Sequence, residues 1–180
     1  LLTTSVTAAL PQKQSELLTS QLLAIMNDPA MPLPSLSAVA IRKGEVVYSQ
    51  HLGSKRLATG TKPAQPADAN TMFRIASISK FVTTLGTMKM VEQGRLSLDA
   101  DISDYLGYRL RNPHFPDQPI TLRMLLTHTS SLRDEGGFKW EPSVDLRDVL
   151  VPGRRFYKGE SWSKAAGPGQ YFEYVNFNSG

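Results

Sequence analysis

The chain has 180 residues, of which 41% are hydrophobic and 20% are charged, with a net charge of +4 and no cysteine. This composition is ordinary for a globular protein, and the length suits one domain or a large piece of one. Without cysteine, disulfides, thiolate metal sites and a cysteine nucleophile are excluded. No apolar run approaches the roughly 18 residues of a membrane span. Basic and acidic residues are interspersed, so we expect no nucleic acid as a partner.

The first predicted element is an amphipathic helix over Gln12–Met26. Leu18, Leu22 and Ile25 recur there at spacings of four and three, which place them on one helix face. The following "NDP" is typical of a helix end.

A β-hairpin is predicted next, in the segment "SLSAVAIRKGEVVYSQHLG". Two β-rich runs are joined there at Lys43 and Gly44, which favours a tight turn. Val39 and Ile41 share one face of the first strand, and Val47 lies in the returning strand. We therefore expect these three side chains to pack against a core.

A long helix is predicted after a loop. The stretch 54–70 is rich in Lys, Pro, Ala and Gly, which indicates a surface loop. From Ser77 onward, apolar residues recur at three and four places, namely Phe81, Leu85, Met88 and Val91. Gly94 then provides a typical C-terminal stop. We expect the apolar stripe to hold the start of this helix rigidly.

Shorter helices are predicted in "LSLDADISDYLG" and "ITLRMLLTHTSSL", which are separated by a proline-rich segment. Beyond Leu132 the sequence is loop-like, with repeated glycine and proline. The order of helix, hairpin, long helix and a mostly helical region predicts an α+β fold with an antiparallel sheet and a helical subdomain.

Ser77 and Lys80 are the first candidates for chemistry. Residues three apart at a helix start lie on one face, and free N–H groups there favour a developing oxyanion. A serine hydroxyl is a poor nucleophile at neutral pH and needs such an adjacent base. The alternative is an N-capping serine followed by a solvated lysine. Ser161 and Lys164 repeat the spacing in a Gly/Pro-rich loop, and we interpret that copy as a chance match.

The three histidines, His51, His114 and His128, form no ligand pair at helical spacing. We therefore expect no metal site and no cofactor. His128 is interpreted as a structural residue, hydrogen-bonded near a helix end. The sequence contains no glycine-rich phosphate-binding motif and no Gly-x-Ser-x-Gly elbow.

Three motifs in order, "FRIASISK", "LLTHTSSL" and "PGQYFEYVN", resemble the serine β-lactamase-like family. This family contains class C β-lactamases, penicillin-binding D,D-peptidases and related esterases. The resemblance begins at about Ser35 and implies the β-lactamase/D,D-peptidase fold, an antiparallel sheet flanked by helices plus a mostly helical subdomain. It divides one catalytic domain into a helix and hairpin at about 11–75 and a nucleophile helix with helical subdomain at about 76–180.

The resemblance also assigns roles to four residues. Ser77 corresponds to the acylated nucleophile, and Lys80 and Tyr174 to the groups that accept its proton. Asn176 corresponds to the asparagine that binds substrate or orients the lysine. A Ser-Asp-Asn tripeptide is absent, and Tyr-Val-Asn is typical of the class C and esterase side of the family.

One family motif, Lys-Thr-Gly or His-x-Gly, would lie beyond Gly180. We therefore expect a C-terminally incomplete chain, ending just inside a helix that bears Tyr174. A C-terminal fragment of the same protein would be the partner that makes it competent. The implied function is a class C-like β-lactamase or D,D-peptidase, acting on a β-lactam or D-Ala-D-Ala-type peptide. The alternatives are an esterase or D-aminopeptidase, or a non-catalytic penicillin- or peptidoglycan-binding module. The family also implies export, to the periplasm.

Overall fold

The structure is a computed structural model that describes residues 9–137 and 139–179. Contacts between residues divide the chain into two units, one ending at Arg74 and the other beginning at Ile75. In the described part, no helix has both the length and the apolar character that a membrane crossing requires.

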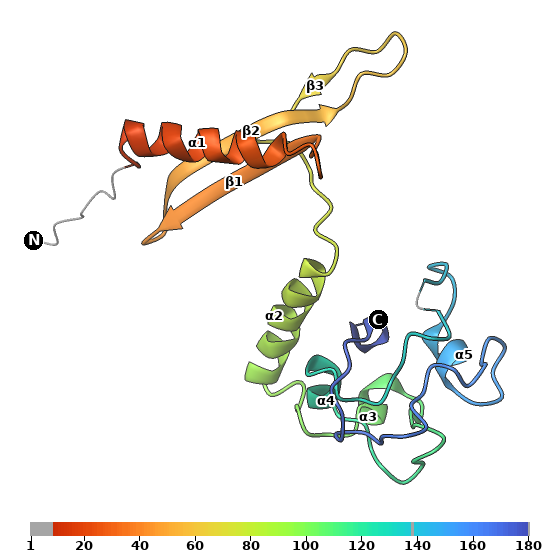
Figure 1. The fold of residues 1–180 in the computed structure, drawn as a ribbon. Helices are drawn as coiled ribbons and strands as arrows, with labels where there is room; N and C mark the ends of the chain where they lie inside the picture. The colour runs from red at the N-terminus through yellow and green to blue at the C-terminus, as the bar shows by residue number, and fades with distance from the viewer. Residues whose placement is uncertain (1–8, 138, 180) are drawn as a thin grey trace, which may run out of the picture. The chain divides into compact units, whose positions relative to one another are not determined.

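The first unit combines one helix with a three-stranded antiparallel sheet. Its elements are α1 (Gln12–Met26), β1 (Ser35–Arg42), β2 (Glu45–Arg56) and β3 (Gln65–Pro66), and the strand order is β1-β2-β3. Helix α1 lies along the β1–β2 hairpin (Figure 1). The bounds of α1 confirm the predicted helix. The stretch 54–70 is not only a loop, because β3 pairs there with the end of β2.

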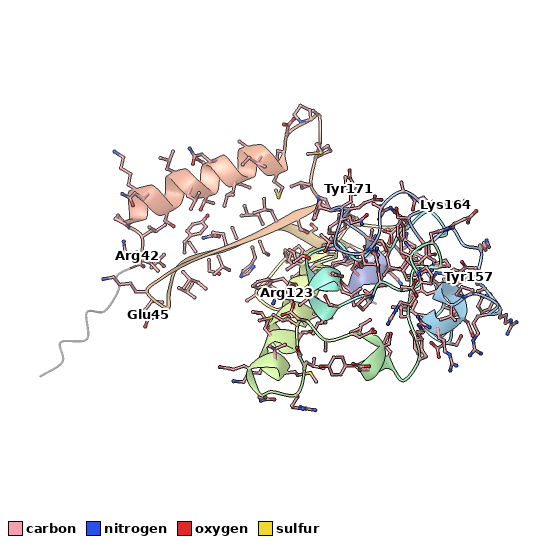
Figure 2. All side chains as sticks on the ribbon, turned by 90° about the horizontal axis from the view of Figure 1, so that it is seen from below. Arg42, Glu45, Arg123, Tyr157, Lys164 and Tyr171 are labelled. Atoms are coloured by element: carbon pink, nitrogen blue, oxygen red, sulfur yellow. The ribbon has the colours of Figure 1, made fainter. Side chains whose placement is uncertain are left out.

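The predicted hairpin is confirmed, including its turn. Lys43 and Gly44 have φ angles of 52° and 82°, and two consecutive positive φ angles suit the right-handed twist of paired strands. Arg42 and Glu45 pair across the turn, and Figure 2 shows both at that end of the hairpin. Val47 in the returning strand is buried, as predicted.

The expected burial of Val39 and Ile41 is wrong, because these side chains are 56% and 66% exposed. The other face of the hairpin is the one that α1 covers. Ala40 pairs with Tyr48, whose hydroxyl lies 2.9 Å from the hydroxyl of Thr19 in α1. Alternation along a strand identifies two faces but does not say which of them meets a helix.

The second unit contains the candidate site. Its helices are α2 (Ile78–Glu92), α3 (Ser103–Leu106), α4 (Leu122–Leu126) and α5 (Leu146–Leu150), followed by the 3₁₀ helix η1 (Asn176–Ser179). Helix α5 lies in a region predicted as loop. The Asp145 side chain caps it by accepting a hydrogen bond from the Arg147 N–H, so a capping aspartate marked its start.

Helix α2 ends as predicted, with Gly94 in the left-handed conformation at φ 69°. The expectation that its apolar stripe is packed is wrong in the described structure. Phe81 and Leu85 are 63% and 55% exposed, and no residue of α2 is buried. Val91 near the helix end packs against the core. The start of the helix is instead held by hydrogen bonds of Lys80 in its first turn, with Ser77 and Asn176.

The hydrophobic core of this unit draws on irregular segments as well as helices. Its buried members are Ile102, Leu110, Ile120, Leu122, Leu132, Val149, Leu150, Trp162, Val175 and Phe177. Val175 and Phe177 are core residues beside the predicted Tyr174 and Asn176. The core therefore anchors the segment that carries these two polar residues.

Replacing Ile120 with alanine should destabilise the second unit. Ile120 is fully buried, and its carbonyl accepts a hydrogen bond from the Ile102 N–H at 2.8 Å. Losing a buried aliphatic side chain costs about 2–5 kcal/mol, so the denaturant midpoint should fall. Ile25→Ala, at an exposed position of α1, is the control and should shift stability by less than about 0.5 kcal/mol. Equal midpoints for both variants would contradict this assignment of the core.

Candidate active site

Ser77 lies at the start of α2, immediately before its first residue. Ala76 before it has a φ of 44°, so the backbone bends sharply into the helix. Lys80 follows one turn later, and its Nζ donates a hydrogen bond to Ser77 Oγ at 3.2 Å. The Ser77 side chain contributes no capping hydrogen bond to the helix. The structure therefore does not support the alternative that the Ser77 side chain caps the helix.

Tyr174 and Asn176 approach the same lysine from the C-terminal segment. Lys80 Nζ donates to Asn176 Oδ1 at 2.9 Å and lies 5.2 Å from the centre of the Tyr174 ring. The structure thus brings together all four residues that the sequence singled out. Tyr174 lies in an irregular segment before η1 and not on a helix, which corrects the expectation. The core residues Val175 and Phe177, on either side of Asn176, anchor this segment.

The surroundings of Tyr174 favour its phenolate. Hydrogen bonding with Ser77, and then with Lys80, holds the pKa of the Tyr174 phenol below its ordinary value of 10. The Lys80 charge acts in the same direction, whereas desolvation and the negative charge of Asp134 oppose it. Tyr174 is 49% exposed, so solvent and small molecules reach the ring. The lowered pKa increases the fraction of Tyr174 that is present near neutral pH as phenolate, the form that can accept a proton.

Asp134 is a residue that the sequence reasoning missed. Its Oδ2 accepts hydrogen bonds from the Asn176 backbone N–H at 2.9 Å and from Asn176 Nδ2 at 2.7 Å. Because the amide nitrogen is bound to Asp134, the amide oxygen turns toward Lys80. Asp134 follows the "LLTHTSSL" motif by two residues, but no spacing rule marks it. Only the fold brings it to Asn176.

His128 lies beyond the end of α4 and is hydrogen-bonded there, as the sequence predicted. Its Nδ1 accepts a hydrogen bond from the Val175 N–H at 3.1 Å. Its ring stacks on Tyr174 with centroids 4.6 Å apart and planes 29° apart. The contact with Tyr174 was not predicted.

The second Ser-x-x-Lys pair is not a second site. Ser161 is buried whereas Lys164 is exposed, and no hydrogen bond joins them within residues 139–179. A spacing of three residues brings two side chains together only where the backbone is helical.

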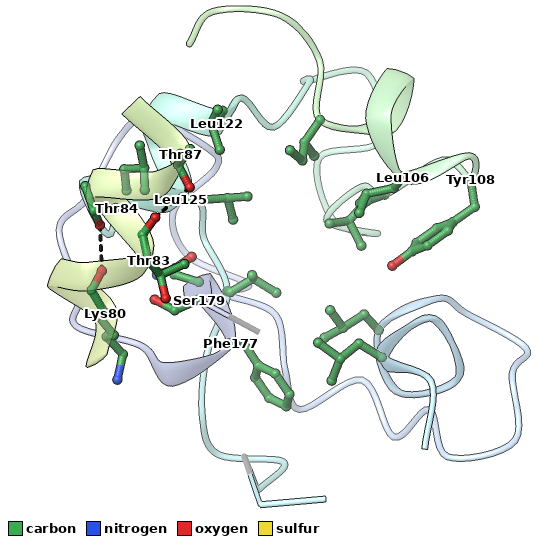
Figure 3. Close-up of a pocket in the computed structure, with 17 residues that line it drawn as sticks. Lys80, Thr83, Thr84, Thr87, Leu106, Tyr108, Leu122, Leu125, Phe177 and Ser179 are labelled. Carbon is green, nitrogen blue, oxygen red and sulfur yellow. Dashed lines mark hydrogen bonds between the residues drawn. The ribbon is translucent and has the colours of Figure 1, made fainter. Parts of the chain in front are cut away.

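An apolar cavity of about 210 Å³ lies between α2 and the core, with Lys80 at its edge (Figure 3). Leucines of the core, together with Tyr108 and Phe177, form most of its lining. Along α2, the Thr84 hydroxyl donates to the Lys80 carbonyl at 2.8 Å. The ammonium of Lys80 contacts Ser77 and Asn176, so Lys80 belongs both to the polar cluster and to the edge of this cavity.

Comparisons with known proteins agree on one family. Residues 26–180 match the family model described as Beta-lactamase. Lovastatin esterase from Penicillium rubens is 36% identical over 103 residues, which cover 49% of this chain and 25% of the esterase. The octameric penicillin-binding protein homologue from Pyrococcus abyssi has a TM-score of 0.66 and 29% identity, covering 91% of this chain and 36% of that chain. A class C beta-lactamase in complex with cefoxitin has a TM-score of 0.67 at 22% identity, covering 92% and 42%, and shows the fold alone.

The chain spans about a quarter of the length of the curated relatives it matches. The structural neighbours confirm the predicted fold, a β-lactamase/D,D-peptidase-like arrangement of an antiparallel sheet with helices. The family model matches most of the chain, and the same segment contains Ser77, Lys80, Tyr174 and Asn176. The chain belongs to the beta-lactamase family, within the superfamily of serine β-lactamases and penicillin-binding proteins.

Proposed function

We propose that this protein is a serine hydrolase that forms an acyl-enzyme on Ser77. One observation carries the proposal: Lys80 Nζ contacts both Ser77 Oγ and Asn176 Oδ1, at 3.2 and 2.9 Å, beside a tyrosine with a lowered pKa. A nucleophile, a proton acceptor and a group that orients them are the parts that acyl transfer requires.

In the proposed acylation step, the Ser77 hydroxyl gives its proton to the Tyr174–Lys80 pair. The Ser77 oxygen then forms a bond to the substrate carbonyl carbon, and the electron pair of the carbonyl π bond moves to the carbonyl oxygen, which becomes the oxyanion. When the tetrahedral intermediate collapses, the bond to the leaving group breaks, and the same pair returns the proton to that group. Water then attacks the ester on Ser77 in the same way and releases the acid.

The oxyanion requires hydrogen-bond donors, and the Ser77 backbone N–H is one candidate. Among residues 9–137 and 139–179, this N–H donates to no other group, whereas those of Ile78 and Ser79 bind the Ile75 and Ala76 carbonyls. Removing one oxyanion donor typically costs about 10²–10³ in rate. A second donor would come from the part of the family fold that lies outside this chain, so activity requires that part, as a continuation or as a complementing fragment.

The substrate class depends on which type of carbonyl group Ser77 attacks, that of a β-lactam, a peptide or an ester. The Tyr-Val-Asn motif supports a class C-like β-lactamase or D,D-peptidase, acting on a β-lactam or on a D-Ala-D-Ala-type peptide. The similarity to lovastatin esterase supports an ester as the second candidate. Hydrolysis of a cephalosporin, a D-Ala-D-Ala peptide and a short-chain p-nitrophenyl ester by the full-length protein, side by side, decides between them.

The experiment that tests the proposal is covalent labelling. A fluorescent penicillin or a fluorophosphonate should label the folded full-length protein, and mass spectrometry of the digested adduct should locate the label on Ser77. Turnover of any of the three substrates after the burst distinguishes an enzyme from a binding module that captures ligand without release. Absence of label from both reagents would contradict the proposal.

Replacing Asp134 with asparagine should lower kcat/KM by about 10–100-fold, because a hydrogen bond to a charged group is worth about 1.5–3 kcal/mol. The Asn176 amide loses the carboxylate that orients it. Asp134 raises the pKa of Tyr174, so its removal should shift the pH–rate midpoint of Tyr174 downward. Glu135→Gln, at the exposed neighbouring position, is the control and should change neither value. An unchanged midpoint in Asp134→Asn would contradict the assigned role.

A further inference from the structure

His128 has an unusual backbone. Its φ is 57°, in the left-handed region that residues with a β-carbon rarely occupy. The residue follows α4 by two positions, and its N–H donates to the Leu125 carbonyl at 3.2 Å. Strained positions persist where surrounding contacts hold them, and they cluster at functional sites. Apart from the bond to Leu125, the hydrogen bonds and ring contacts of His128 are made with the C-terminal segment that carries Tyr174.

His128 binds that segment on both sides of Tyr174. Its carbonyl accepts a hydrogen bond from the Glu173 N–H at 2.9 Å, and its Nδ1 accepts one from the Val175 N–H at 3.1 Å. Between these two bonds, the imidazole ring stacks on the Tyr174 ring at 4.6 Å. A single residue therefore restrains the backbone before and after Tyr174 and the plane of its phenol.

The hydrogen bonds define the form of the imidazole. A backbone N–H only donates, so Nδ1 carries no proton and the neutral ring is protonated on Nε2. Nδ2 of the buried Asn178 also lies 3.0 Å from Nδ1. Burial lowers the pKa of His128, the nearby positive charge of Lys80 lowers it further, and Asp134 opposes them. The ring is therefore neutral at pH 7, and a proton on Nδ1 would oppose two N–H donors.

We propose that neutral His128 is a positioning residue for Tyr174, holding the phenol in line with Ser77 and Lys80. The inference rests on the proposed function, because it assumes that Tyr174 accepts the Ser77 proton. Displacements of about 1 Å at a reacting group cost up to about 10²-fold in rate. Protonation of His128 should release this restraint and slow acylation.

The test compares His128→Asn with His128→Gln in the full-length protein. Asparagine tolerates positive φ, and its Oδ1 replaces Nδ1 as the acceptor for Val175, so His128→Asn removes the ring alone. Glutamine keeps neither the ring nor the acceptor at that place. We expect acylation to be about 10-fold slower in His128→Asn, with KM and Tm nearly unchanged, and slower again in His128→Gln. His114→Asn is the control and should react as the wild type does.

The pH profile provides a readout that a purely structural role would not change. The wild-type acylation rate should decrease as the pH falls through the lowered pKa of His128, below about 6.5. The rate of His128→Asn should not show this decrease. The ¹⁵N chemical shifts of the wild-type ring should show an unprotonated Nδ1 at pH 7. A protonated Nδ1, or His128→Asn with the wild-type rate and profile, would overturn the inference.

Tyr174→Phe separates this inference from the proposed function. If Ser77 in the Tyr174→Phe variant is acylated at the wild-type rate, Tyr174 is not the proton acceptor and both proposals fail. If Tyr174→Phe is slow while both His128 variants react normally, the positioning role alone fails. If all three are slow, with Tyr174→Phe the slowest, both are supported.

Discussion

Replacing Ser77 with alanine should abolish covalent labelling of the full-length protein and lower hydrolysis by a factor on the order of 10⁶, as expected when a serine hydrolase loses its nucleophile. The Lys80 ammonium would keep its contact with Asn176 at 2.9 Å, so the fold should be preserved. The measurement is in-gel fluorescence after treatment with a labelled penicillin or fluorophosphonate, followed by initial rates on the preferred substrate.

Two serines serve as matched controls for Ser77→Ala. Ser79 is exposed in the same helical turn, and Ser161 has the same spacing to a lysine. Ser79→Ala and Ser161→Ala should both retain the label. Persistent labelling of Ser77→Ala, or its loss in Ser79→Ala alone, would show that the nucleophile is another residue.

Replacing Lys80 with methionine should lower the acylation rate by about 10²–10⁴-fold, the range expected when an acid–base group is lost. Methionine keeps an unbranched apolar stem but lacks the ammonium that contacts Ser77, Asn176 and the Tyr174 ring. Lys80 lowers the pKa of Tyr174 by hydrogen bonding and by charge, so this pKa should rise toward 10 in the variant. The residual activity should therefore peak at higher pH than that of the wild type.

Lys89→Met is the matched control on the same helix. Lys89 is exposed and pairs with Glu92 at 2.7 Å, and surface pairs of this kind contribute about 0–1 kcal/mol. Its rate and pH profile should match those of the wild type. If Lys80→Met acylates as fast as Lys89→Met does, the ammonium takes no part in the chemistry.

Local sequence patterns predicted the elements whose hydrogen bonds connect near neighbours. The bounds of α1 and the turn at Lys43 and Gly44 both agree with the structure. Gly94 ends α2 because it adopts a positive φ at low cost. The Asp145 cap of α5 belongs to the same kind of signal, although it was overlooked.

Burial was predicted less well than secondary structure. Val39, Ile41 and the stripe residues Phe81, Leu85 and Met88 of α2 have the periodicity of packed faces, yet they are exposed in the described structure. Periodicity shows that a face is apolar, but it does not show which other element covers it. Strand β3 was missed for a related reason. A two-residue strand has no pattern of its own and exists only through pairing with β2.

The sequence alone determined that Ser77 and Lys80 lie within reach of each other, because three residues at a helix start span less than one turn. It also supplied Tyr174 and Asn176 through a family motif. The tertiary structure alone decided that Asp134 orients Asn176 and that His128 restrains Tyr174. The hydrogen bond between Asp134 and Asn176 joins residues that are 42 positions apart, and the bond between His128 and Val175 joins residues that are 47 positions apart. Contacts at such separations depend on how the chain packs, because no local periodicity relates the two partners.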